Sequence, residues 1–242
     1  MLADIARGTQ TLARGLGLLK HRQILPYVLV PLAINLVLFG GLIWFGFSRF
    51  APLVEWLMSF VPGFLDFLRW ILWIFLGLLT AVIAFFTFTP VANIIAAPFN
   101  ALMAEKLEIL LTGSSPSSEL SFTQMAIASI ASQLGKLGYV ALWYLGLLLI
   151  TLIPIVNIAA PVLWVLFGSW LLALEYMDYP MGNHDIGFRE QRQRLAERRG
   201  LAMGFGGAVM IMTTIPVINF LAMPAAVAGA TVLWAEQLCK PA

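Results

Sequence analysis

The sequence predicts an all-α integral membrane protein with two long transmembrane helices, helical hairpins broken at proline and asparagine, and short interfacial helices. Of the 242 residues, 61% are hydrophobic and 11% are charged, and the mean hydropathy is +0.91. Soluble domains average roughly 45–50% apolar and 25% charged residues. Three long charge-free stretches are each interrupted by the same Pro-Asn-Pro element. The chain must therefore lie mostly in lipid, as a single membrane domain.

The first part of the chain reads as an amphipathic segment followed by one span. Residues 1–22 carry four basic residues without an apolar core between them, which is not typical of a cleavable secretory signal. Residues 23–48 contain no charged residue, and a single span needs roughly 20 apolar residues. The aromatic, sparsely charged residues 49–69 predict an interfacial helix in the headgroup region.

Three further charge-free stretches are each too long for one span and too short for two. We expect residues 70–104 to form a span with a break, and residues 137–174 and 200–235 to form hairpins. Proline removes a backbone donor and disfavours a continuous helix. The interrupting elements recur at intervals of 64 and 62 residues: Pro90, Asn93, Pro98; Pro154, Asn157, Pro161; and Pro216, Asn219, Pro224.

The breaks allow two arrangements in the membrane. In residues 137–174 the arms "YVALWYLGLLLITLI" and "VLWVLFGSWLLALEY" reach only about 23 Å each, against a hydrocarbon core of about 30 Å. Kinked full spans and hairpins that enter and leave on one side both remain possible. The asparagine of each element could cap carbonyls that the proline leaves unpaired, or it could simply be a turn residue.

The basic residues predict the orientation. Twelve of the fourteen Lys and Arg lie in residues 1–22, 99–136, 175–199 and the C-terminal tail. The positive-inside rule then places residues 49–69 outside and both ends of each hairpin in the cytoplasm. Residues 188–199 read as a solvated helix whose five arginines also suit anionic lipid headgroups.

Few side chains suit an enzyme. His21 and His184 lie in opposite halves of the chain, and neither an HExxH nor a G-x-S-x-G motif occurs. The "NHD" run at 183–185 is typical of a cap or a turn. We therefore expect no enzyme activity, metal site or cofactor. A net charge of +2 gives no reason to expect nucleic-acid binding, and the single cysteine, Cys239, excludes an intrachain disulfide.

Polar residues within the apolar stretches are candidates for a pathway or for the hairpin tips. A carboxylate at membrane depth is costly and usually functional, although Glu105 and Glu108 could also lie at the water boundary. If it lies deeper, Glu105 could take up a proton. The candidates are Asn35, Asn93, Asn100, Asn157, Asn219, Glu105 and Glu108.

Three long motifs stand out in the chain: "TPVANIIAAPFNALMAEKLEILLTG", "APVLWVLFGSWLLALEYMDYPMGNH" and "MPAAVAGATVLWAEQ". These motifs resemble those of the CysZ family of bacterial sulfate permeases. The likeness runs from residue 15 to Trp234. It implies sulfate uptake across the inner membrane for cysteine synthesis, two long spans with membrane-embedded hairpins, and a homo-oligomer. A membrane scaffold or lipid-interacting protein without transport activity is the alternative.

The resemblance also implies a sulfate site at a Gly-Leu-x-Leu-Leu turn that begins the first long helix. Glycines let successive backbone N–H groups converge on an anion, and a helix N-terminus adds positive charge. Where the family pattern has adjacent arginines, this chain has Leu25 and Pro26, so Lys20 and Arg22 would substitute for them. Alternatively, Lys20 and Arg22 anchor the end of a span at the membrane interface. The expected site is Gly15, Leu16, Gly17, Leu18, Leu19, Lys20, His21 and Arg22.

Overall fold

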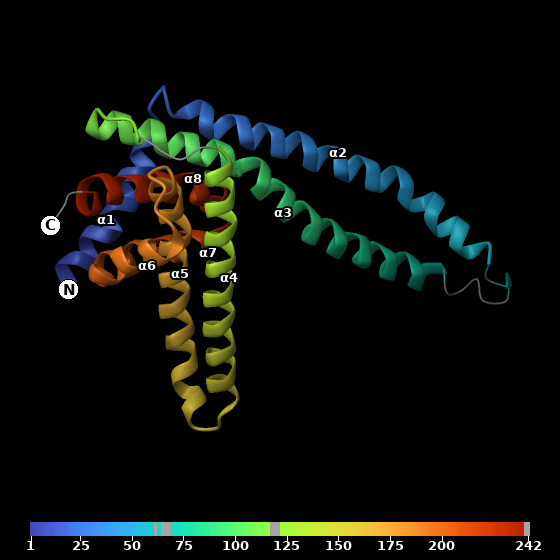
Figure 1. The fold of residues 1–242 in the computed structure, drawn as a ribbon. Helices are drawn as coiled ribbons and strands as arrows, with labels where there is room; N and C mark the ends of the chain where they lie inside the picture. Colours follow the sequence, from blue (N-terminus) through green and yellow to red (C-terminus); the bar gives the residue numbers. More distant parts are fainter. Residues whose placement is uncertain (61, 64–68, 117–121, 240–242) are drawn as a thin grey trace. The chain divides into compact units, whose positions relative to one another are not determined.

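The computed structural model describes residues 1–60, 62–63, 69–116 and 122–239, and its described elements are all helical (Figure 1). The Asn93 side chain and part of the expected interfacial helix lie outside the described residues. The helices are α1 (Leu2–Leu18), α2 (Leu25–Met58), α3 (Arg69–Thr112), α4 (Phe122–Leu152), a 3₁₀ turn (Val156–Ala159), α5 (Ala160–Gly182), α6 (Phe188–Glu197), α7 (Arg199–Thr214), α8 (Pro216–Leu233) and a π-helical turn (Trp234–Leu238).

The chain divides into two compact units. One unit joins residues 1–27 to residues 100–242, and the other comprises residues 28–99. Among the described residues, four helices are long and apolar enough to cross a membrane, which confirms the predicted membrane class. They are Leu25–Met58, Ala131–Leu152, Val156–Gly182 and Leu221–Leu238.

Small residues let α1, α5, α7 and α8 pack closely in the first unit. A Cβ atom on Gly206 of α7 would lie 1.8 Å from the Ser169 carbonyl oxygen of α5, so only glycine allows this approach. Phe205, Val227 and Leu233 are fully buried around these crossings. Small residues at helix crossings are the usual means by which membrane helices gain van der Waals contact.

The second Pro-Asn-Pro element ends one helix and begins the next, as the sequence predicts. Helices α4 and α5 form an antiparallel hairpin (Figure 1), and Ile155 adopts a φ of 74° in the turn between them. Pro161 stands in the first turn of α5, where its missing N–H costs nothing. The third element behaves in the same way, because α7 ends at Thr214 and extended Ile215 leads into α8.

The first Pro-Asn-Pro element does not break its helix, contrary to the prediction. Helix α3 continues through it for 44 residues. A proline removes a single helical hydrogen bond, whereas ending a helix leaves four N–H or four C=O groups without partners. In an apolar environment the continuous helix is therefore the less costly arrangement.

Three helices also extend beyond their predicted ends. Helix α2 runs to Met58, so residues 49–58 continue the first span as helix. Helices α4 and α5 extend past the charge-free stretch 137–174 because the charges that bound it pair with one another. Lys136 Nζ lies 2.5 Å from a carboxylate oxygen of Glu175 and 3.5 Å from one of Asp178.

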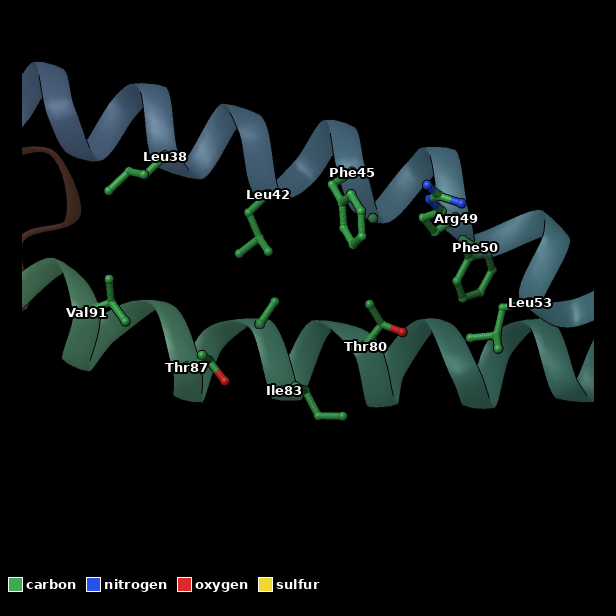
Figure 2. A pocket seen from close by; sticks show the side chains of 12 residues that line it. Leu38, Leu42, Phe45, Arg49, Phe50, Leu53, Thr80, Ile83, Thr87 and Val91 are labelled. Atoms are coloured by element: carbon green, nitrogen blue, oxygen red, sulfur yellow. The ribbon is translucent and has the colours of Figure 1, made fainter.

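In the second unit, α2 and α3 line an apolar groove of about 670 Å³. Figure 2 shows Leu42 and Phe45 of α2 directed toward α3, with Thr80 and Thr87 on the opposite wall. Near the C-terminal end of α2 and the N-terminal end of α3, the rings of Phe50 and Trp73 meet edge to face with their centres 4.8 Å apart.

Candidate functional site

A short turn between α1 and α2 presents three basic residues. Leu19 and Ile24 are buried and anchor the turn, whereas Lys20, His21 and Arg22 are exposed. The His21 carbonyl accepts hydrogen bonds from the amides of residues 24 and 25, which fixes the turn. Among the described residues, no carboxylate lies within ion-pair distance of the two permanent charges in this turn. It therefore presents unpaired positive charge of the kind that an oxyanion requires.

The glycines before this turn do not form the expected anion-binding backbone. Residues 15–18 are the last turn of α1, and they do not begin the first long helix. Their N–H groups point back into α1, and a helix C-terminus carries partial negative charge. Gly15 is buried against α8, and a Cβ there would lie 2.2 Å from the Gly229 nitrogen. A Cβ on Gly17, by contrast, would contact nothing within 4 Å. Gly15 is thus a packing residue.

Arg14, one residue before Gly15, is tied to the C-terminal region. Its guanidinium forms a two-pronged hydrogen-bonded ion pair with the Glu236 carboxylate. That hydrogen bond raises the pKa of Arg14, which keeps the guanidinium charged. This basic residue is therefore occupied by a partner, unlike Lys20 and Arg22.

A second cluster is built on the buried face of α3. Asn100, Ala104 and Glu108 recur every four residues on this face, and each is at least 96% buried. Glu105 lies off this face and is only half-buried. Asn100 Nδ2 and Glu108 Oε2 are buried and have no hydrogen-bond partner among the described residues. Buried polar atoms without partners are rare, and they mark positions where water or an ion can bind.

Glu108 joins three distant segments of the chain. His184 Nε2 lies 2.7 Å from Glu108 Oε1, and Trp234 Nε1 donates a 3.1 Å hydrogen bond to the same oxygen. The rings of His184 and Trp234 lie 5.2 Å apart, and the Arg194 guanidinium lies 5.5 Å over the Trp234 ring. We call Glu108, His184 and Trp234, together with Asn100 about two turns away on the same face of α3, the polar cluster. It combines a carboxylate with an imidazole, a pair that can hold and release a proton.

Polar contacts made by residues on both sides of His184 in the chain tie this segment to neighbouring helices. Asn183 is the C-cap of α5, as the cap or turn interpretation of "NHD" predicts, and its Nδ2 donates to the Ala101 carbonyl of α3. Gln191 is buried and donates both to Asp178, at 2.7 Å, and to the Ile186 carbonyl, at 2.8 Å. Helices α3, α5 and α6 are therefore connected by polar side chains directly beside the cluster.

The asparagines at the two hairpin turns do not cap carbonyls, so of the two interpretations the structure favours simple turn residues. The side chains of Asn157 and Asn219 are exposed and form no hydrogen bond among the described residues. Their backbone N–H groups instead donate to the carbonyls of Ile153 and Ile215, at 3.0 and 2.8 Å. Each asparagine stands four residues after the carbonyl concerned, so ordinary helical bonding satisfies it.

The remaining predicted residues are dispersed. Asn35 lies in the second unit, with a buried Oδ1 that has no hydrogen-bond partner among the described residues. Of the candidates whose side chains the structure describes, only Asn100 and Glu108 lie on one buried face. His184 and Trp234 were not predicted as the partners of Glu108. The available signal was that "IAAPFN", "DYPMGNH" and "ATVLWAEQ" are long specific motifs, each of which supplies one side of the cluster or an immediate neighbour.

The chain is similar to named proteins over almost its whole length. A family model described as "Sulfate transporter CysZ/Etoposide-induced protein 2.4" matches residues 11–224. A protein named "Sulfate transporter CysZ" from Pseudomonas fluorescens (strain Pf0-1) is 44% identical over 98% of this chain and 96% of its own length. A protein of the same name from Pseudomonas syringae pv. tomato is 42% identical over 98% of this chain and 95% of its own length. One from Vibrio parahaemolyticus is 39% identical over 92% of each chain.

These relatives are bacterial and are named as transporters, not as enzymes, and the spans found in the structure agree with a multi-pass membrane protein. A family match over most of the chain and relatives of this identity are sufficient to assign membership. The chain belongs to the family of sulfate transporter CysZ and etoposide-induced protein 2.4.

Proposed function

We propose that this protein is a sulfate permease of the bacterial inner membrane that supplies sulfur for cysteine biosynthesis. The observation that carries the proposal is the likeness, over nearly the full length, to proteins named for sulfate transport. Lys20 and Arg22 support it, because they are exposed and have no ion-pair partner among the described residues, and a dianion needs uncompensated positive charge at its entry site. His21 between them adds a further donor. In this proposal side chains, rather than glycine amides, make the first contact with sulfate.

Radiolabelled sulfate uptake into liposomes that contain only this protein tests the proposal. We expect uptake above that of protein-free liposomes, and strong reduction in the Lys20→Ala/Arg22→Ala variant. Titration calorimetry on the same variant should show sulfate affinity lowered by more than about a hundred-fold, because charge-assisted hydrogen bonds contribute about 1.5–3 kcal/mol each. Arg7→Ala is the control, since Arg7 is also exposed but lies 4.0 Å from Asp4. Absence of uptake in correctly inserted protein would favour a scaffold function.

We also propose that transport is coupled to protons through the polar cluster. Glu108 is the better candidate than Glu105, because it is buried and contacts an imidazole. A buried carboxylate would repel sulfate unless its charge is compensated by a proton or by His184. Uptake driven by an inward proton gradient, and abolished by a protonophore, supports this coupling. Uptake that is insensitive to both excludes it.

We propose finally that the protein is a homo-oligomer, as the family resemblance implies. The open apolar groove between α2 and α3 supports this proposal, because side chains of a second copy could fill it. The molecular mass of the purified protein in lipid nanodiscs tests it. Particles that hold a single copy at all concentrations would refute it.

A further inference from the structure

A groove of about 520 Å³ opens in the first unit where α4, α5, α6 and α7 meet. Aromatic rings from α4 and α5 form its wall. Trp143 and Phe167 stack with ring centres 5.6 Å apart, and Trp170 Nε1 donates a 3.0 Å hydrogen bond to the Tyr139 hydroxyl. Because each ring is held by a neighbour, the wall is a fixed apolar surface.

Two arginines lie among the residues that line this groove, and no carboxylate does. The Arg192 guanidinium lies 5.0 Å over the Tyr139 ring, which directs its charge to the groove. Arg199 lines it from the start of α7. Neither arginine has an ion-pair partner in the described part of the chain, whereas neighbouring Arg194 pairs with Glu190 at 2.6 Å. The groove therefore carries two uncompensated positive charges.

The apolar wall extends away from these charges along helices that belong in lipid. On α4 the lining runs from Tyr139 to Leu147, about 12 Å at 1.5 Å per residue. Both Ala131–Leu152 and the α5 segment opposite are long and apolar enough to cross a membrane. The groove thus has a cationic end and an aromatic, apolar length along a membrane helix.

We propose that this groove binds one anionic phospholipid. The phosphate ester contacts Arg192 and Arg199, and an acyl chain lies along Trp143 and Phe167. Charge complementarity selects the occupant, since a zwitterionic headgroup brings its own cation to a site that holds two cations and no carboxylate. The volume lies within the range of roughly 300–1,000 Å³ that is usual for specific ligand pockets. This site is separate from the Lys20–Arg22 turn and does not depend on sulfate transport.

Native mass spectrometry of delipidated protein tests the proposal with phosphatidylglycerol and phosphatidylcholine as probes. The Arg192→Gln/Arg199→Gln variant should bind its first phosphatidylglycerol on the order of thirty-fold more weakly, since each basic residue near an anionic lipid contributes about a five-fold effect. Arg7→Gln/Arg189→Gln removes the same charge from exposed residues outside the groove and should change binding less than three-fold. Arg192→Lys/Arg199→Lys retains the charge and should retain most of the binding.

Two further measurements separate a lipid from a free anion and from general surface charge. Leu163→Trp fills the apolar part of the groove without changing charge, and it should weaken phosphatidylglycerol binding as well. Inorganic phosphate at millimolar concentration should not displace the lipid. Displacement by phosphate, equal losses in the two glutamine variants, or equal retention of phosphatidylcholine would each overturn the proposal. If the Arg192→Gln/Arg199→Gln variant does not fold, the other two variants still test the proposal. The lysine variant should retain phosphatidylglycerol binding, and Leu163→Trp should weaken it.

Discussion

Glu108 Oε1 and His184 Nε2 lie 2.7 Å apart, although 76 residues separate them in the chain. The same carboxylate oxygen accepts a hydrogen bond from the indole of Trp234. One buried oxygen therefore holds together α3, the end of α5 and the C-terminal turn. The other oxygen, Oε2, has no hydrogen-bond partner in the described part of the structure, so the same side chain keeps an acceptor available. Different substitutions of Glu108 can therefore separate its structural role from its functional role.

We predict that Glu108→Ala destabilises the protein, whereas Glu108→Gln mainly affects transport. Alanine leaves the buried Trp234 indole N–H without a partner, at a cost of about 1–3 kcal/mol, and it also removes the partner of the part-buried His184 ring. Glutamine keeps an acceptor oxygen for both but cannot carry the exchangeable proton of a carboxylate. Melting temperature in detergent and the pH dependence of sulfate uptake per folded molecule measure the two effects.

Glu105→Gln is the matched control on the same helix, because Glu105 is half-buried and makes no hydrogen bond among the described residues. It should leave both the melting temperature and the pH profile of uptake close to those of the unsubstituted protein. An equal loss of pH dependence in the Glu105 and Glu108 glutamine variants would show that the buried pair has no special role.

The two glycines of the predicted anion turn should respond oppositely to alanine. In Gly15→Ala the new Cβ would lie 2.2 Å from the Gly229 nitrogen, so α1 and α8 must separate, at about 1–3 kcal/mol. In Gly17→Ala the Cβ meets open space, and the helix gains about 0.5–1 kcal/mol. Thermal unfolding of both variants measures the difference. Normal stability of Gly15→Ala with lost sulfate binding would restore the backbone-amide site.

The membrane class and two of the three breaks could be predicted because composition and proline placement act locally. The starts of α5 and α8 are determined by a few neighbouring residues, because Pro161 and Pro216 stand in the first turns of these helices. The continuity of α3 could not be predicted in this way. Whether a proline kinks or ends a helix depends on the free-energy cost of leaving four backbone groups unpaired at the helix end. That cost depends on the surrounding lipid or protein, which the local sequence does not specify.

The candidate site was only partly predictable for a related reason. Spacing along α3 places Asn100 and Glu108 on one face, but nothing local distinguishes that face from the one that holds Glu105. The distinction comes from His184 and Trp234, which tertiary packing brings from 76 and 126 residues away. The misplacement of Gly15 has the same origin, because its role is set by contact with Gly229.

Alanine at the hairpin asparagines should be nearly neutral for stability. The Asn157 and Asn219 side chains are exposed and make no hydrogen bond in the described part of the structure, and the backbone N–H groups that bond Ile153 and Ile215 persist in alanine. Substitutions at such positions usually change stability by less than about 0.5 kcal/mol. Melting temperatures of the two single variants test this. A marked decrease in either would return a capping role to the amide.

The turn between α4 and α5 should lie within the hydrocarbon core, so that the hairpin enters and leaves on one side. The charged cluster of Lys136, Glu175 and Asp178 marks one level across both helices. From Lys136 to Leu152 is sixteen residues, or about 24 Å, which is less than a core of about 30 Å. The turn itself is apolar, with Ile155 at its tip 85% exposed, as lipid contact requires.

Cysteine labelling in a Cys239→Ser background tests this depth. Val156→Cys places a thiol at the turn, Ser59→Cys lies after α2 in the segment predicted to be outside, and Ser114→Cys lies in the segment predicted to be cytoplasmic. An impermeant maleimide added to spheroplasts should label Ser59→Cys rapidly, and Ser114→Cys only after permeabilisation. Val156→Cys should react slowly in both conditions, because few thiols in hydrocarbon are ionised and the reagent does not enter it. Rapid labelling of Val156→Cys in intact spheroplasts would show that α4 and α5 cross the whole membrane.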